Sequence, residues 1–442
     1  MLKGTKLLNL CMIVAAFLFV WNAGNVNAST LVPQTVLSGE CIPQFKSALP
    51  IFGPGYNAAL PRVNALSHPF LTVTMKEIDQ QVLPAGTDTC GLGLTFGKTR
   101  VWAYETTDTL TKKVLGPALW PGVTLETKRF ISTTVKYVNQ LPTFNPLSPT
   151  GPGLVQGLIS VDQTIHWADP LNSPMMNPCT EDPTGDCLQP FIGAPPAVVH
   201  LHGGEVSSSS DGGPEAWFTP DGKTGPGSRT LGSPGPGKAI YFYPNSQEPG
   251  TLFFHDHALG ATRTNLYSGL AAFYFIRDPA REPRNLPSGP YEIELAIQDR
   301  QFSRDSQLFF PDGSGDPNSN LNGTPANPTI HPFWIPEFFG DVAVVNGAPW
   351  PFMKVEPRRY LFRIVDGSNA RFYNLTFGNA PVYQIGGDDN YLDAPVLVNT
   401  VFIAPGERAY VIVDFTSLAG HDLPPIIVPH SELYLATHKK VM

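Results

Sequence analysis

Several features common in other protein classes are missing from this chain. It has no excess of positive charge, because 29 Lys and Arg stand against 37 Asp and Glu and leave a net charge of −8. That balance argues against binding to nucleic acid or to an anionic membrane surface. There is no Gly-Lys phosphate loop and no Ser-His-Asp context. Past the N-terminal segment no run is apolar and long enough to cross a membrane.

The N-terminal 28 residues have the pattern of a secretory signal. Lys3 and Lys6 form a basic start, residues 7–21 are apolar except for one asparagine, and Ala28 ends a small-residue cleavage site. The apolar run is short for an uncleaved membrane anchor, which needs about 20 residues. We therefore expect cleavage after Ala28 and a periplasmic or secreted location for the mature chain.

Cysteine is scarce, with five residues in the chain and none after position 187. Removal of the signal leaves four, and an even count in an exported protein suggests disulfides. Cys179 and Cys187 flank a turn-rich segment and are expected to pair with each other. Cys41 and Cys90 would then form the second bond.

Long stretches of helical period are also missing. Short apolar runs instead alternate with turn residues, in a chain with 46 Pro and 41 Gly. This pattern predicts an all-β fold of sandwiches or barrels. The turn-rich stretch around residues 277–287 suggests a boundary, so we expect one β-rich unit over residues 29–285 and a second over 286–425. Residues 426–442 are too few for a third.

What the chain does have is two His-x-His pairs, His200-Leu201-His202 and His255-Asp256-His257, each at the end of a strand-like run. Residues i and i+2 of a strand point to the same face, so two imidazoles in each pair lie roughly 6.5 Å apart. That spacing suits one shared metal ion or two neighbouring ones, and imidazole is a ligand for zinc, copper, iron and nickel. A lone pair would more often be two hydrogen-bonded strand histidines. Two pairs, each followed within three residues by glycine, favour a metal site.

These pairs and their surroundings resemble the multicopper oxidases. The similar segments are VDQTIHW at 161–167, VHLHGG at 199–204, DGGPEAWF at 211–218 and FHDHALG at 254–260. Further similarity at residues 99–104, 336–341, 345–347, 356–363 and 368–373 extends over nearly the whole mature chain. The branch it resembles contains the bacterial spore-coat laccases, the bilirubin oxidases and phenoxazinone synthase.

The resemblance implies tandem cupredoxin (plastocyanin-like) Greek-key β-sandwiches and bound copper. In that family a cluster of three coppers lies between the first and third domains, bound by eight histidines in four His-x-His pairs. His200 would bind the type 2 copper, and His202, His255 and His257 would bind the type 3 pair. Asp211 falls in a segment that supplies an acidic residue near the cluster, on a route for protons to O2. An ordinary solvated loop aspartate is an equally good interpretation of Asp211.

The chain departs from the family pattern after His257. No later segment has His-x-His form and no late cysteine exists, so half of the trinuclear ligands and the type 1 site are expected to be absent. Metal held by half of its ligands binds weakly. We therefore expect no intense blue colour and poor oxidase activity from the chain alone. A third domain, lost or carried by a separate polypeptide, would complete the centre.

Two classes of function remain open. The first is a copper-dependent oxidoreductase that couples oxidation of phenolic, pigment-like or metal-ion substrates to reduction of O2 to water, in a truncated or split form. The second is a non-catalytic copper-binding or scaffold protein. A zinc hydrolase built on one histidine pair is less favoured, because no general base accompanies the pair.

Overall fold

The computed structural model describes residues 34–53, 58–143, 194–310, 338–388 and 390–419. The signal segment, the proposed Cys179–Cys187 bond and residues 426–442 lie outside these ranges. The all-β prediction is confirmed, since strands dominate and α2 (Thr262–Ser268) is the one α-helix among the described residues. None of the described helices has the length and apolar character needed to span a membrane.

Two five-stranded sheets pack face to face. The histidine sheet has the order β10 (Val199–His202), β12 (Gly250–Asp256), β13 (Ala271–Arg277), β8 (Gly122–Lys128) and β4 (Arg62–Asn64). The facing sheet has the order β11 (Lys238–Tyr243), β9 (Thr133–Asn139), β5 (Phe70–Gln80), β6 (Thr99–Asp108) and β7 (Val114–Leu119). Phe254 of β12 lies with its ring centroid 5.1 Å from that of Tyr104 and 6.4 Å from that of Tyr137, so aromatic side chains fill the space between the sheets.

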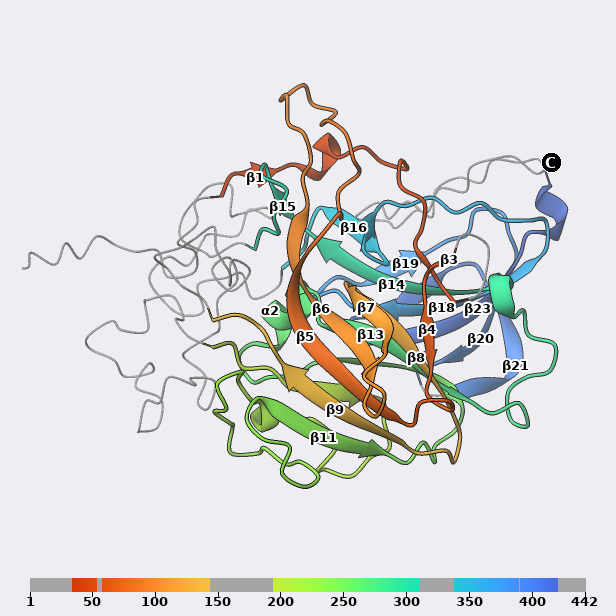
Figure 1. Ribbon diagram of the computed structural model, residues 1–442. Helices are drawn as coiled ribbons and strands as arrows, with labels where there is room; N and C mark the ends of the chain where they lie inside the picture. Colours follow the sequence, from red (N-terminus) through yellow and green to blue (C-terminus); the bar gives the residue numbers. More distant parts are fainter. Residues whose placement is uncertain (1–33, 54–57, 144–193, 311–337, 389, 420–442) are drawn as a thin grey trace, which may run out of the picture.

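A seven-stranded sheet lies beside this sandwich (Figure 1). Its order is β17 (Ala348–Pro349), β16 (Val342–Val345), β14 (Glu292–Arg300), β18 (Arg359–Asp366), β23 (Arg408–Asp414), β20 (Val382–Gly387) and β21 (Asn390–Val398). It meets the outer face of the histidine sheet through a buried cluster in which Phe253, Phe273 and Phe275 contact Ala296 and Val365. The histidine sheet is therefore covered on both faces.

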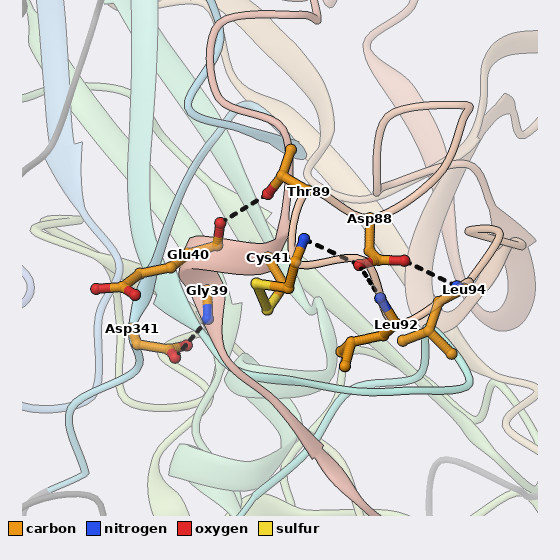
Figure 2. The surroundings of a disulfide bond; sticks show 9 residues. Gly39, Glu40, Cys41, Asp88, Thr89, Leu92, Leu94 and Asp341 are labelled. Atoms are coloured by element: carbon orange, nitrogen blue, oxygen red, sulfur yellow. Dashed lines mark hydrogen bonds between the residues drawn. A yellow bond between two sulfur atoms is a disulfide. The ribbon is translucent and has the colours of Figure 1, made fainter.

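Short elements complete the described chain. The two-stranded pairs are β1 (Val36–Leu37) with β15 (Phe302–Ser303), β2 (Ile51–Phe52) with β3 (Ala58–Leu60), and β19 (Tyr373–Leu375) with β22 (Val401–Ile403). Single 3-10 turns are η1 (Gly39–Cys41), η4 (Pro214–Ala216), η5 (Gly289–Tyr291) and η6 (Thr416–Leu418). The predicted Cys41–Cys90 disulfide is formed and ties η1 to the loop between β5 and β6 (Figure 2).

Candidate metal site

The period-two alternation of β10 and β12 decides which way the histidines point. On β10, Val199 and Leu201 are buried toward the facing sheet, so His200 and His202 project from the opposite face. The strands are antiparallel, with His200 opposite His255 and His202 opposite Phe253. His257 follows directly after the end of β12, where its backbone N–H donates to the carbonyl of Val198.

This register brings all four predicted histidines together. The His200 ring centroid lies 5.8 Å from His202, 5.8 Å from His255 and 5.0 Å from His257. His202 and His255 are 5.4 Å apart, and His255 and His257 are 5.7 Å apart. The spacing within each pair is slightly below the 6.5 Å expected for strand neighbours, because the rings tilt toward one another.

Hydrogen bonds at the rings leave Nε2 of His200 and Nε2 of His202 available to a metal, whereas Nε2 of His255 accepts a bond from His202. Nδ1 of His200 lies 2.6 Å from the carbonyl oxygen of Asp211, and Nδ1 of His255 lies 2.7 Å from that of Asp256. A carbonyl only accepts, so each Nδ1 must carry the proton and each Nε2 keeps its lone pair. Nδ1 of His202 then donates to Nε2 of His255, at 3.2 Å. Ligating histidines in metal sites usually have such a carbonyl partner on the second nitrogen.

Burial favours the neutral imidazole, the form that binds metal, at His202, His255 and His257. It lowers the pKa of His202 to about 4, helped by the charge of Arg408, and it lowers the pKa of His255 well below the usual range. The pKa of His257 is also lowered, by burial and by His200. Nδ1 of His257 is buried and has no hydrogen-bond partner. Such an orphaned nitrogen fits a metal ligand better than a structural histidine.

The donor chemistry therefore fits copper or another imidazole-binding ion. The four imidazoles form two pairs that lie side by side on one face of the adjacent strands β10 and β12. Within the described ranges, no three His, Cys, Asp or Glu side chains gather closely enough around one point to hold a metal ion.

Asp211 lies beside the cluster, and its contact is partly through its backbone. Its carbonyl accepts from His200, and its carboxylate Oδ1 lies 3.5 Å from the same Nδ1, with the side chain 42% exposed. Asp211 thus reaches both the cluster and solvent. Its role in proton transfer stays a prediction.

Sequence analysis missed Asp256, which lies between two histidines but points to the other face of β12. It is fully buried, and its carboxylate accepts from the backbone N–H of Val198, the N–H of Ala258 and the side chain of Asn265, at 2.9 to 3.1 Å. Burial raises the pKa of Asp256 to about 7, against the effect of these donors. The available signal was the period of two, which directs the middle residue of His-Asp-His into the core.

Comparisons with known proteins agree with the predicted fold and family. The chain is 36% identical over 327 residues to a laccase from Bacillus subtilis, which covers 74% of this chain and 52% of that protein. It is 40% identical over 270 residues to the multicopper oxidase LPR1 of Arabidopsis thaliana, which covers 60% of this chain and 43% of that protein. The chain thus spans about half the length of these curated relatives. No family model matches it.

Solved structures show the same fold at lower identity. A laccase from Pediococcus acidilactici aligns with a TM-score of 0.56 at 20% identity, covering 93% of this chain and 65% of that one. A variant of the multicopper oxidase McoA from Aquifex aeolicus aligns with a TM-score of 0.54 at 22% identity, covering 89% and 65%. These matches confirm the predicted cupredoxin-type β-sandwich architecture. By its sequence similarity to laccases and other multicopper oxidases, the chain belongs to the multicopper oxidase family.

Proposed function

We propose that His200, His202, His255 and His257 bind copper, and that the chain takes part in oxidation of a small reducing substrate coupled to reduction of O2 to water. The observation that carries the proposal is the convergence of four imidazoles on one face of β10 and β12. The division into cupredoxin units at residues 29–285 and 286–425 and the export of the chain after Ala28 belong to the same proposal.

Each residue of the site has a task in this scheme. Copper, when bound, would supply the one-electron redox chemistry that O2 reduction needs. His200 would hold the type 2 ion through Nε2, oriented by its bond to the Asp211 carbonyl. His202, His255 and His257 would hold the type 3 pair. The Asp211 carboxylate, 42% exposed beside His200, would serve the route for protons between solvent and the cluster.

The incomplete ligand set also supports the alternative, a copper-binding or scaffold protein without turnover. Because no three ligands of the described residues surround one point, the chain alone is expected to bind copper weakly and oxidise phenolic dyes negligibly. It should also lack intense blue colour, which needs a cysteine thiolate on copper. Cys41 and Cys90 are bonded to each other and therefore supply none. Additional His-x-His pairs, from a third domain in the same or a separate chain, would be required for turnover.

The test is copper binding by the purified full chain and two single-site variants. After loading with Cu2+ and dialysis, His255→Ala should retain less metal than the unchanged chain, because one of the facing pairs is broken. His68→Ala removes an imidazole that pairs with Asp108 outside the cluster, and should retain as much metal as the unchanged chain. Equal copper content in all three proteins would overturn the site.

Oxygen uptake with a phenolic substrate then separates the two functions. The oxidase proposal expects little uptake by the copper-loaded chain and a large increase when a polypeptide carrying two further His-x-His pairs is fused or added. If the chain consumes no O2 even when it is loaded with copper and joined to the polypeptide with the two further pairs, the oxidase proposal is wrong. The copper-binding or scaffold function then remains.

A further inference from the structure

The turn that leads from β22 into β23 of the seven-stranded sheet lies against His202. The N–H of Glu407 donates to the carbonyl of Ala404 at 3.0 Å, with Pro405 second and Gly406 third at φ +84°, the pattern of a type II turn. A Cβ placed on Gly406 would lie 3.0 Å from Cε1 of His202 and 3.6 Å from its Nε2. The bare backbone of Gly406 therefore forms one wall of the space that the His202 ring occupies.

Two further contacts fix this turn. The N–H of Gly406 donates to the carbonyl of Asp366 at 2.8 Å, and the N–H of Ala404 donates to the carboxylate of Glu407 at 2.7 Å. Asp366 ends β18, so the turn is attached to the middle of the seven-stranded sheet. Movement of the turn away from His202 would break its bond to Asp366, whereas the bond between Ala404 and Glu407 holds the shape of the turn itself.

Phe253 forms a second wall. Its ring stacks against His202 and against His255, with 4.7 Å between centroids and interplanar angles of 26° and 21°. The guanidinium of Arg408 lies over the same phenyl ring, 5.9 Å from its centroid. Arg408 donates to the carbonyl of Gly406 at 2.9 Å, and therefore joins the two walls.

Thr251, four residues before His255, attaches β12 to the same sheet. Its N–H donates to the hydroxyl of Tyr410 at 2.7 Å, its carbonyl accepts from Arg408 at 3.1 Å, and its hydroxyl accepts from Arg363 at 2.8 Å. The residue is fully buried. Every polar group of Thr251 thus links the histidine-bearing strand to β18 or β23.

We propose that Gly406 and Phe253 are positioning residues that hold the His202 imidazole for metal binding. The seven-stranded sheet thereby helps to set the geometry of a site whose four histidines lie on β10, on β12 or directly after it. This inference rests on the proposed copper-binding function. The residues act through His202 and do not themselves contact the metal.

The first test compares Gly406→Ala with Gly235→Ala. The two glycines have nearly the same backbone, at φ +84° and +87°, but a Cβ on Gly235 would meet nothing within 4 Å. Both substitutions carry the same left-handed backbone strain, and only the first fills the space beside His202. In the metal-free full chain labelled with 13C-histidine, Gly406→Ala should shift the Cε1–H resonance of His202, assigned with His202→Ala, and Gly235→Ala should leave it in place.

Copper binding gives the second readout. Gly406→Ala should weaken binding of Cu2+ about 10- to 100-fold, the usual effect of disturbing residues behind a metal ligand, with no change for Gly235→Ala. An unshifted His202 resonance in Gly406→Ala would overturn the proposal. If the unchanged chain binds no Cu2+, the proposed function fails, and the resonance in the metal-free protein still decides the positioning role.

Phe253→Leu and Phe273→Leu provide a second pair if Gly406→Ala does not fold. Both phenylalanines belong to the same buried cluster, so both variants should lose similar stability. Only Phe253 stacks on the imidazoles, so only Phe253→Leu should shift the His202 and His255 resonances. Equal shifts in the two variants would reduce Phe253 to a packing residue and overturn its part of the proposal.

Discussion

At the scale of single residues, the His-Asp-His sequence of β12 divides two tasks between two faces of one strand. The histidines face the seven-stranded sheet, whereas Asp256 faces the core and bonds Val198, Ala258 and Asn265. Val198 directly precedes β10, so the carboxylate fixes the two histidine-bearing strands relative to each other. Asp256 therefore supports the site by holding the backbone of the two strands in place, and its side chain points to the face opposite the histidines.

Asp256→Asn should destabilise the fold even though the side chain keeps its shape. The N–H groups of Val198 and Ala258 and the side-chain amide of Asn265 all donate to the Asp256 carboxylate. In asparagine an NH2 group replaces one carboxylate oxygen, so at least one of these donors would lose its acceptor. The expected loss is about 1–3 kcal/mol of unfolding free energy, the penalty for a buried group without its partner. Urea unfolding at pH 8 measures it.

Asp79→Asn provides the comparison for Asp256→Asn. Asp79 pairs with Arg100 at 2.8 Å, but its side chain is 48% exposed. The loss for an exposed pair should stay below about 1 kcal/mol. An effect of Asp256→Asn no larger than that of Asp79→Asn would contradict the role given to the buried carboxylate.

At the scale of elements, arginines and glutamates join the histidine sheet to the seven-stranded sheet. Glu292 of β14 accepts two bonds from Arg277 of β13, at 2.7 and 2.8 Å, and one from Arg363 of β18 at 2.6 Å. Arg62 of β4 adds a contact at 3.2 Å. These residues line a cleft of about 900 Å³ beside residues 279–289, which lead from β13 toward β14.

This network predicts sensitivity to acid. Burial alone would raise the pKa of Glu292, but Arg363 and Arg277 hold it well below the usual value of 4.5. A carboxyl whose pKa is depressed by folding stabilises the protein fully above its unfolded pKa and loses that effect as the pH falls through the folded one. Stability from Glu292 should therefore decline progressively below about pH 4.5.

Glu292→Gln should cost about 3–5 kcal/mol at pH 7, since it leaves buried guanidinium groups without their carboxylate. Its difference from the unchanged chain should shrink as urea unfolding is repeated at lower pH. Glu248→Gln alters a carboxylate that is 42% exposed beside Arg129, and should cost less than about 1 kcal/mol. A pH-independent difference for Glu292→Gln would be inconsistent with the depressed pKa.

Strands and site were predictable from sequence to different degrees. The all-β class was predictable because short apolar runs alternate with turn residues, and strands such as β10 and β11 bury every second side chain. The strand β21 carries no such pattern, since its residues are largely exposed. The four histidines were predicted from i, i+2 spacing, whereas the approach of Gly406 is a contact between distant segments that no local pattern encodes.

At the scale of the whole molecule, the Cys41–Cys90 disulfide anchors the N-terminal segment. Figure 2 shows Asp88 beside the bond, accepting from the backbone N–H of Leu92 and Leu94, while Thr89 donates to the carbonyl of Glu40. On the other side, Gly39 donates to the carboxylate of Asp341, which directly precedes β16 of the seven-stranded sheet. The segment therefore connects a loop of the sandwich to the seven-stranded sheet.

The double variant Cys41→Ser with Cys90→Ser should lose about 2–4 kcal/mol of unfolding free energy, because the bond closes a long loop in the unfolded chain. Reductant should produce a similar loss in the unchanged chain. As a control, the unfolding free energy of the double variant is measured with and without the same reductant. Any difference is the contribution of the remaining cysteines. Unchanged stability of the double variant would show that the hydrogen bonds of Figure 2 suffice to hold the segment.

The place of the histidines in their sheet has a kinetic consequence. Among the described strands, β10 lies at the edge of the histidine sheet, so His200 and His202 lie at its margin, with the side chain of His200 20% exposed. An ion at that margin can exchange with solvent without any strand separating. Metal uptake by the folded, metal-free chain should accordingly be fast compared with global unfolding, and its rate should not change at urea concentrations below the unfolding transition.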